Sequence, residues 1–102
     1  MKEYKCFTRS TATYPDALSN TLSEVMYLAL GLSGEAGEVA EHVKRLYCSA
    51  PLDRHALRSE LGDVLWYLVR LADTFSFSME EIIEANISKL SERKANGSIH
   101  EH

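Results

Sequence analysis

The fold of this chain is decided by two short stretches, Gly34-Glu35-Ala36-Gly37-Glu38 and Glu60-Leu61-Gly62-Asp63. Each stretch places two carboxylates three residues apart within a helical pattern of apolar residues. Because positions i and i+3 share one face of an α-helix, the two acids of each stretch point the same way. Asp63 is the only charged residue between Leu61 and Val69, and an unpaired carboxylate in apolar surroundings is costly. If the two helices are antiparallel neighbours, four acids converge and require cations.

This acid set predicts the kind of metal. Four carboxylates without a histidine favour Mg²⁺, with Mn²⁺ possible, over zinc, copper or haem iron. Di-iron bundles instead use Glu-x-x-His on two helices, and none of the four histidines falls at that offset from an acid of these stretches. The alternative is that two amphipathic helices each carry solvated acids.

The remaining pattern is helical throughout. Apolar residues recur at three- and four-residue steps from about 20 to 47, and again from an N-cap at Asp53 to about Phe75. Residues 2–13 suggest a short helix, and residues 78–81 read as a capping box that opens a helix ending near Arg93. The alternating pattern of strands is absent, so we expect an all-α four-helix bundle. The repeated glycines of the long helix indicate either a close neighbour or a local break near 31–34.

The third helix also predicts an assembly. Residues 64–69 are six apolar or aromatic residues in a row, which indicates burial on more than one side. A chain of 102 residues can hardly enclose such a helix alone. We therefore expect a homo-oligomer, a dimer or a tetramer, with this helix at a subunit interface. The chain is expected to be one domain, 1–102, with its core at about 20–95 and a flexible tail at 96–102.

Composition excludes several classes of protein. The net charge of −4 provides no basic surface for a nucleic-acid polymer. No apolar run reaches the length of a membrane span, and no apolar leader follows Met1. Cys6 and Cys48 are far apart and read as free thiols, although one disulfide is the alternative. We therefore expect a cytoplasmic protein that does not bind membranes.

Candidate substrate-binding residues lie near the acids in sequence and on the last helix. Asn86, Lys89 and Arg93 form one stripe suited to phosphate oxygens, and Lys44 is a further candidate cation. The alternative for the stripe is a solvated helix face. Of Trp66 and Tyr67, we expect one to be core and the other to stack on a nucleobase.

Three segments closely resemble the MazG-like family of nucleoside triphosphate pyrophosphohydrolases, within the all-α NTP pyrophosphatase superfamily. They are Leu30-Gly31-Leu32-Ser33-Gly34-Glu35-Ala36-Gly37-Glu38-Val39-Ala40-Glu41, Glu60-Leu61-Gly62-Asp63-Val64-Leu65-Trp66-Tyr67-Leu68 and Asn86-Ile87-Ser88-Lys89-Leu90-Ser91-Glu92-Arg93. The resemblance covers roughly residues 25 to 97. One departure is visible, since many members open the first motif with two adjacent glutamates and this chain has Gly34 at the first of those positions.

The resemblance implies an activity and a site. It implies that (d)NTP is hydrolysed to (d)NMP and pyrophosphate and that Tyr67 lies in the nucleotide pocket. The implied Mg²⁺ ligands are Glu35, Glu38, Glu60 and Asp63, with Glu35 or Glu38 as the general base, and the implied phosphate or sugar contacts are Asn86, Lys89 and Arg93. A house-cleaning nucleotide hydrolase is the main hypothesis. The alternatives are a base-selective dCTPase or dUTPase and a non-catalytic helical interaction module.

Overall fold

The computed structural model describes residues 1–97, which form four α-helices and no strand. The helices are α1 (Lys2–Ser10), α2 (Leu22–Tyr47), α3 (Arg54–Thr74) and α4 (Met79–Ala95). The predicted all-α class is confirmed, and the predicted helices differ from these bounds by a few residues at most. The part of the predicted flexible tail from 98 to 102 lies outside the described residues.

Each of the three longer helices begins at a capping side chain. Thr21 accepts a hydrogen bond from the backbone N–H of Glu24 at 3.3 Å, and Asp53 accepts one from Ala56 at 3.0 Å. Ser78 and Glu81 form the predicted capping box, because each side chain bonds the backbone N–H of the other, at 3.1 and 2.9 Å. Such caps satisfy the N–H groups that a helix start leaves unpaired.

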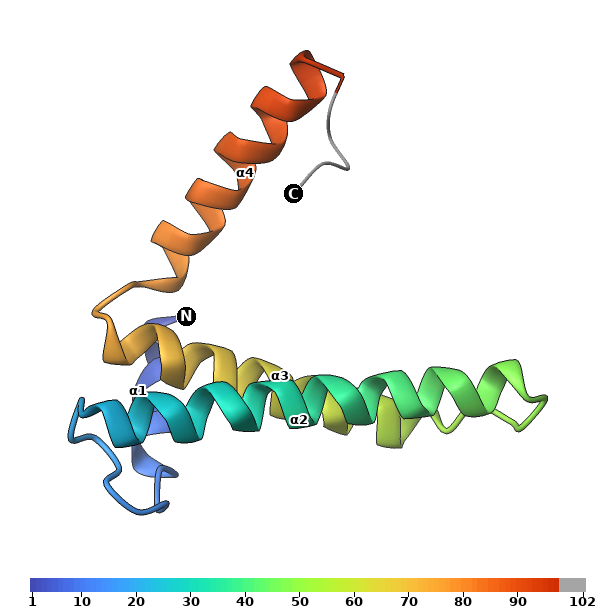
Figure 1. Ribbon diagram of the computed structural model, residues 1–102, viewed down its shortest axis with the longest axis horizontal. Helices are drawn as coiled ribbons and strands as arrows, with labels where there is room; N and C mark the ends of the chain where they lie inside the picture. Colours follow the sequence, from blue (N-terminus) through green and yellow to red (C-terminus); the bar gives the residue numbers. More distant parts are fainter. Residues whose placement is uncertain (98–102) are drawn as a thin grey trace.

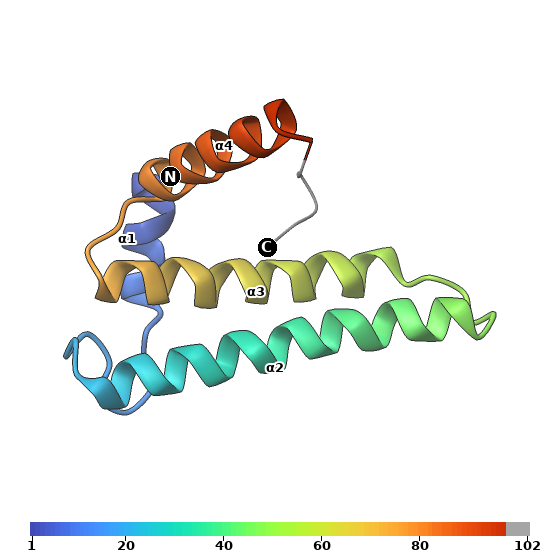
Figure 2. The same ribbon diagram turned by 45° about the horizontal axis from the view of Figure 1, so that its top comes forward.

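α2 and α3 run side by side in opposite directions and form the long arm of the molecule (Figure 1). α1 packs across the end of this arm where α3 finishes and α2 begins. After the turn at residues 75–78, α4 leaves the arm, and it stands apart from α2 and α3 in both views (Figure 2). The four predicted helices are therefore present, but one chain does not close them into a single bundle.

α2 is continuous through its glycines, so the predicted alternative of a break near 31–34 is wrong. The predicted close neighbour is present at one of these glycines, Gly31. A Cβ on Gly31 would lie 2.6 and 2.7 Å from two ring carbons of Tyr67, whereas one on Gly34, Gly37 or Gly62 would meet no atom of residues 1–97 within 4 Å. Gly31 therefore lets the ring of Tyr67 lie directly against the backbone of α2.

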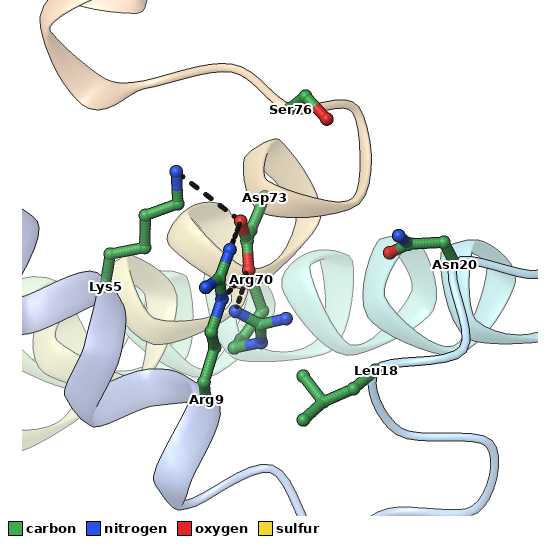
Figure 3. Close-up of a pocket in the computed structure, with 7 residues that line it drawn as sticks. All are labelled: Lys5, Arg9, Leu18, Asn20, Arg70, Asp73 and Ser76. Atoms are coloured by element: carbon green, nitrogen blue, oxygen red, sulfur yellow. Dashed lines mark hydrogen bonds and ion pairs between the residues drawn. The ribbon is translucent and has the colours of Figure 1, made fainter.

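A polar network joins α1 to α3 (Figure 3). Arg9 donates from Nε and Nη2 to the two carboxylate oxygens of Asp73, both at 2.7 Å, and Arg70 donates from Nη1 at 2.7 Å. Lys5 lies 3.5 Å from the same carboxylate. These groups line a pocket of about 380 Å³, but Asp73 already accepts from both arginines. The network therefore ties the partly exposed side chains of α1 to the buried Arg70 and Asp73 of α3.

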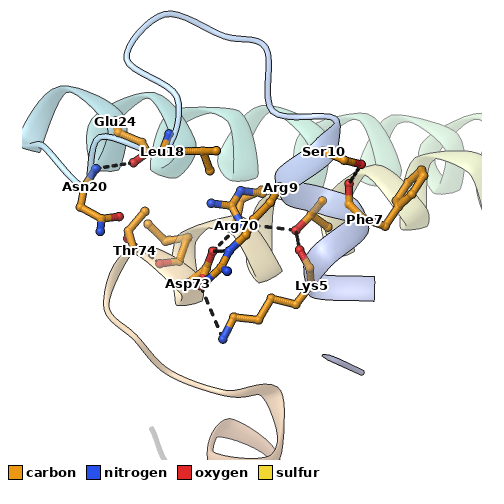
Figure 4. A network of polar contacts seen from close by, with 12 residues as sticks. Lys5, Phe7, Arg9, Ser10, Leu18, Asn20, Glu24, Arg70, Asp73 and Thr74 are labelled. Carbon is orange, nitrogen blue, oxygen red and sulfur yellow. Dashed lines mark hydrogen bonds and ion pairs between the residues drawn. The ribbon is translucent and has the colours of Figure 1, made fainter. Parts of the chain in front are cut away.

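The loop between α1 and α2 is held by Glu24, which is fully buried. Its carboxylate accepts hydrogen bonds from the backbone N–H groups of Leu18, at 2.7 Å, and Asn20, at 2.8 Å (Figure 4). It also accepts one from the Tyr14 hydroxyl. Burial raises the pKa of Glu24, but these three bonds together with the charge of Arg70 bring it below its ordinary value. Glu24 therefore stays ionised and holds the loop in place.

Two further predictions concern cysteines and membranes. Cys6 and Cys48 are both free and exposed, which confirms the interpretation as free thiols. Within residues 1–97, no helix has both the length and the apolar character needed to span a bilayer.

Candidate metal and nucleotide site

The antiparallel pairing of α2 and α3 places the two acid pairs opposite each other. Burial raises the pKa of Glu35, and the charges of Asp63, Glu38 and Glu60 raise it further, in that order. Two of these three charges come from the neighbouring helix. All four predicted acids therefore share one electrostatic neighbourhood, as the antiparallel arrangement predicts.

The acids line two adjoining hollows of the helix pair rather than one. One pocket, of about 310 Å³, is lined by Thr11, Glu35, Asp63, Trp66 and Tyr67. The other, of about 340 Å³, is lined by Glu38, Glu41, His42, Arg45 and Glu60. Each pocket thus combines one predicted acid from α2 with one from α3, and the second pocket also contains Glu41 of α2. Among residues 1–97, no three His, Cys, Asp or Glu side chains come close enough together to hold a metal ion.

Electrostatic repulsion is a reason for the four carboxylates to line two pockets rather than one. Two such charges about 5 Å apart repel by roughly 3 kcal/mol at an effective dielectric near 20. A small rotation of long Glu side chains relieves this repulsion at little cost in rotamer energy. The backbone positions the four acids to face one region, and the side chains spread within it.

Glu60 provides the observation that tests whether a cation fits. Its Oε2 lies 2.8 Å from Nδ1 of His42, yet this atom is buried and accepts no well-aligned hydrogen bond. A buried carboxylate oxygen whose one polar neighbour, His42, is poorly aligned for a hydrogen bond is incompletely satisfied. A hard divalent cation is a suitable further partner for it. In chemical type, the carboxylate oxygens of these two helices are donors that Mg²⁺ or Mn²⁺ prefers.

His42 is a site residue that the sequence analysis missed. It lies four residues after Glu38 on α2, so both project from one face of the helix toward Glu60. The i, i+4 spacing was the available signal. A histidine beside Glu60 is suited to hold that carboxylate in place.

Two aromatic rings, Trp66 and Tyr67, line the pocket that contains Glu35 and Asp63, and Tyr14 and Tyr27 pack against them. Tyr14 stacks on Tyr27 with centroids 4.6 Å apart, and Trp66 meets Tyr67 edge to face at 5.1 Å. The pKa of Tyr67 is raised to about 12, first by burial and then by Tyr27, Glu35 and Asp63. Its phenol therefore stays protonated at neutral pH. The sequence predicted one core ring and one pocket ring, but both Trp66 and Tyr67 line the pocket.

The phosphate-binding residues predicted on the last helix do not line the pockets of the four acids. Asn86 and Lys89 line a separate pocket of about 440 Å³ on α4. Because α4 stands apart from the arm, one chain does not bring these two residues to the acids (Figure 2). Arg93 is half-buried in the last turn of α4, and Lys44 is exposed in the last turn of α2. The roles predicted for these four residues stay predictions.

A family model described as the MazG nucleotide pyrophosphohydrolase domain matches residues 23–98. This match spans α2, α3 and α4, and so includes both acid pairs. The chain belongs to the MazG family. The resemblance noted in the sequence is thereby confirmed, and the family is one of nucleotide pyrophosphohydrolases.

The chain is also similar to a curated phage protein along most of its length. The chain is 34% identical to the Gene 37 protein of Mycobacterium phage L5, over 94% of this chain and 90% of the phage protein. No solved structure matches the chain. The similarity to the phage protein therefore covers a larger share of the chain than residues 23–98, which the family model matches.

Proposed function

We propose that this MazG-family chain is a Mg²⁺-dependent pyrophosphohydrolase that converts (d)NTP to (d)NMP and pyrophosphate. The observation that carries the proposal is the juxtaposition of two acid pairs, from α2 and α3, beside an aromatic-walled pocket. A triphosphate needs charge neutralisation at one end and an apolar surface for its base at the other. House-cleaning of canonical or modified nucleotides is the role we propose, with the chain acting as a single domain in the cytoplasm.

The four acids are the proposed metal ligands. Glu35, Glu38, Glu60 and Asp63 would hold Mg²⁺, or Mn²⁺ in its place, and the buried oxygen of Glu60 supports this assignment. When bound, such ions neutralise phosphate charge and lower the pKa of bound water. Mg²⁺ is proposed from the oxygen-only donor set, since hard cations prefer carboxylates.

The chain's own residues supply the rest of the proposed chemistry. Water attacks the α-phosphorus, the bond from this phosphorus to the α,β-bridging oxygen breaks, and pyrophosphate leaves. Glu35 or Glu38 accepts the proton of the attacking water. Trp66 and Tyr67 bind the base beside Glu35 and Asp63. Lys44, Asn86, Lys89 and Arg93 are proposed to bind phosphate oxygens, a role that suits cationic and amide donors.

An oligomer is part of the proposal. The chain exposes 7395 Å², whereas a compact chain of this mass exposes about 5,800 Å². Its radius of gyration is 16.2 Å, against about 13 Å for a compact domain of this length. Leu22, Met26 and Leu30 form an exposed apolar stripe on α2. A second copy that covers this stripe would also allow α4 of one chain to bring Asn86 and Lys89 to the acids of another.

The test is a panel of canonical and modified (d)NTPs, with pyrophosphate release followed with and without Mg²⁺. Asp63→Asn and Glu38→Gln are expected to lower kcat by about 100-fold or more while the fold survives. Glu3→Gln on the exposed face of α1 is the matched control and should keep full turnover.

The outcomes separate the three hypotheses. Turnover of many bases supports the house-cleaning role, and one strongly preferred base supports a dCTPase or dUTPase. No release with any nucleotide supports the non-catalytic interaction module. Full activity of Asp63→Asn at saturating Mg²⁺ would remove the site assignment.

A further inference from the structure

The hydroxyl of Thr11 joins the end of α1 to the nucleotide pocket. Trp66 on α3 donates a hydrogen bond from Nε1 to Oγ1 of Thr11 at 2.8 Å. Oγ1 also lies 3.1 Å from the carbonyl oxygens of both Phe7 and Thr8. A hydroxyl has one proton and two lone pairs. Its proton therefore goes to one of these carbonyls, and a lone pair accepts the indole N–H.

This bond removes the one polar group of the indole from the pocket. Nε1–H is the sole donor of a tryptophan side chain, which has no acceptor. Because Thr11 accepts this proton, Trp66 presents only its ring to a ligand that enters beside Glu35 and Asp63. A ring stacks on every nucleobase, since each base has a π-face.

The ring is also confined from its sides. Tyr14 meets Trp66 edge to face at 6.1 Å with an interplanar angle of 87°, and Tyr67 meets it at 5.1 Å and 83°. Thr11 in turn is held because α1 is fastened to α3 through Arg9 and Asp73 (Figure 4). The hydroxyl of Thr11 is thus fixed relative to α3, which is the helix that carries Trp66.

We propose that Thr11 is a positioning residue for nucleobase binding, which sets the orientation of the Trp66 indole and makes it a stacking surface without base preference. The nucleotide part of this inference rests on the proposed function. The positioning part rests on the geometry of Thr11 and Trp66 alone. The two parts are tested by separate measurements.

The first measurement compares Thr11→Val with Thr11→Ser. Valine keeps the shape and removes the acceptor, whereas serine keeps the hydroxyl. Because one hydrogen bond to the indole is lost, Thr11→Val is expected to raise KM for dNTPs by about 3- to 10-fold. Its kcat should stay within about 2-fold, since Thr11 is not placed at the reacting atoms, and Thr11→Ser should restore KM.

The second measurement needs no turnover. Trp66 is the only tryptophan of the chain, so its fluorescence reports this ring alone. Thr11→Val should make the indole more accessible to acrylamide, with a larger quenching constant than in the wild type or Thr11→Ser. Circular dichroism checks that each variant is folded, and Thr11 is exposed enough for the fold to survive.

The third measurement tests base preference through Trp66→Phe. If the indole N–H is already committed to Thr11, this variant raises KM for all four dNTPs by a similar factor. Factors that differ by more than about 10-fold between bases would show that the N–H reads the base, and would overturn this part.

The results distinguish the inference from the function on which it rests. Wild-type protein that neither hydrolyses dNTPs nor changes its fluorescence with them contradicts the proposed function, and the acrylamide comparison still decides the positioning. If the wild type hydrolyses dNTPs but Thr11→Val has an unchanged KM and an unchanged quenching constant, the proposed function stands. The same result contradicts the positioning role of Thr11.

Discussion

At the scale of single residues, Gly31 decides where Tyr67 lies. A Cβ at this position would approach two ring carbons to 2.6 and 2.7 Å, a distance that real contacts do not tolerate. Gly31→Ala is therefore expected to push the Tyr67 ring away from α2. The clash costs about 1–3 kcal/mol, which exceeds the gain of about 1 kcal/mol in helix propensity. Near-UV circular dichroism of the aromatic cluster and urea unfolding measure both effects.

Gly34→Ala is the matched control. A Cβ there meets nothing within 4 Å in the described part of the chain, so this variant should leave the near-UV spectrum of the rings unchanged. Equal spectra for Gly31→Ala and the wild type would show that Tyr67 does not depend on the space at Gly31.

At the scale of elements, the attachment of α1 to α3 depends on Asp73. Hydrogen bonds from Arg9 hold the pKa of Asp73 well below its ordinary value against the opposing effect of burial, and Arg70 adds to this lowering. In the unfolded chain, an aspartate carboxyl has a pKa of about 3.9. Because the folded pKa is the lower one, the stabilisation is complete above about pH 5 and is lost as pH falls through 4 toward the folded pKa.

The corresponding prediction concerns stability in acid. Asp73→Asn is expected to lower the free energy of unfolding at neutral pH by about 3–5 kcal/mol, because it takes from the buried Arg70 the carboxylate with which it pairs directly. The variant should also lose less stability than the wild type between pH 5 and 3. Urea unfolding at one protein concentration measures both, with the exposed loop variant Asp16→Asn as control. If the free energy of unfolding of Asp73→Asn depends on pH as steeply as that of the wild type, another group causes the loss of stability in acid. Glu24 is the next candidate.

At the scale of the whole molecule, the exposed apolar stripe and the separate α4 predict self-association. Leu30 is 70% exposed in the single chain, which is unusual for a leucine beside other apolar residues of one stripe. Sedimentation should show a dimer or tetramer for the wild type. Leu30→Glu should shift it toward the monomer, because a charge would be buried in the interface. Ser23→Glu, on an exposed polar position of α2, is the control and should leave the assembly unchanged.

A wild-type protein that sediments as a monomer at tens of micromolar would contradict the oligomer. It would also leave Asn86 and Lys89 without a route to the acids.

The sequence by itself determined the helices, their caps and the acid pairs. These features depend on residues within about four positions of one another, such as Ser78 with Glu81 or Glu35 with Glu38. Local spacing specifies such pairs without knowledge of the fold. His42 belongs to this class, and its spacing from Glu38 could have identified it. The sequence predicted that the acid pairs converge if the two helices are antiparallel neighbours, and the structure shows that α2 and α3 are.

Only the tertiary structure decided the contacts between distant residues. Trp66 and Thr11 are 55 positions apart, and Arg9 and Asp73 are 64 apart. No periodicity in a single sequence reports such a pair, because each partner reads locally as an ordinary helix or loop residue. The direction of α4 is likewise decided after the turn at Ser76, where a positive φ of 60° redirects the chain. The acids are specified by local spacing, whereas the walls of their pocket depend on how α1, α2 and α3 pack in space.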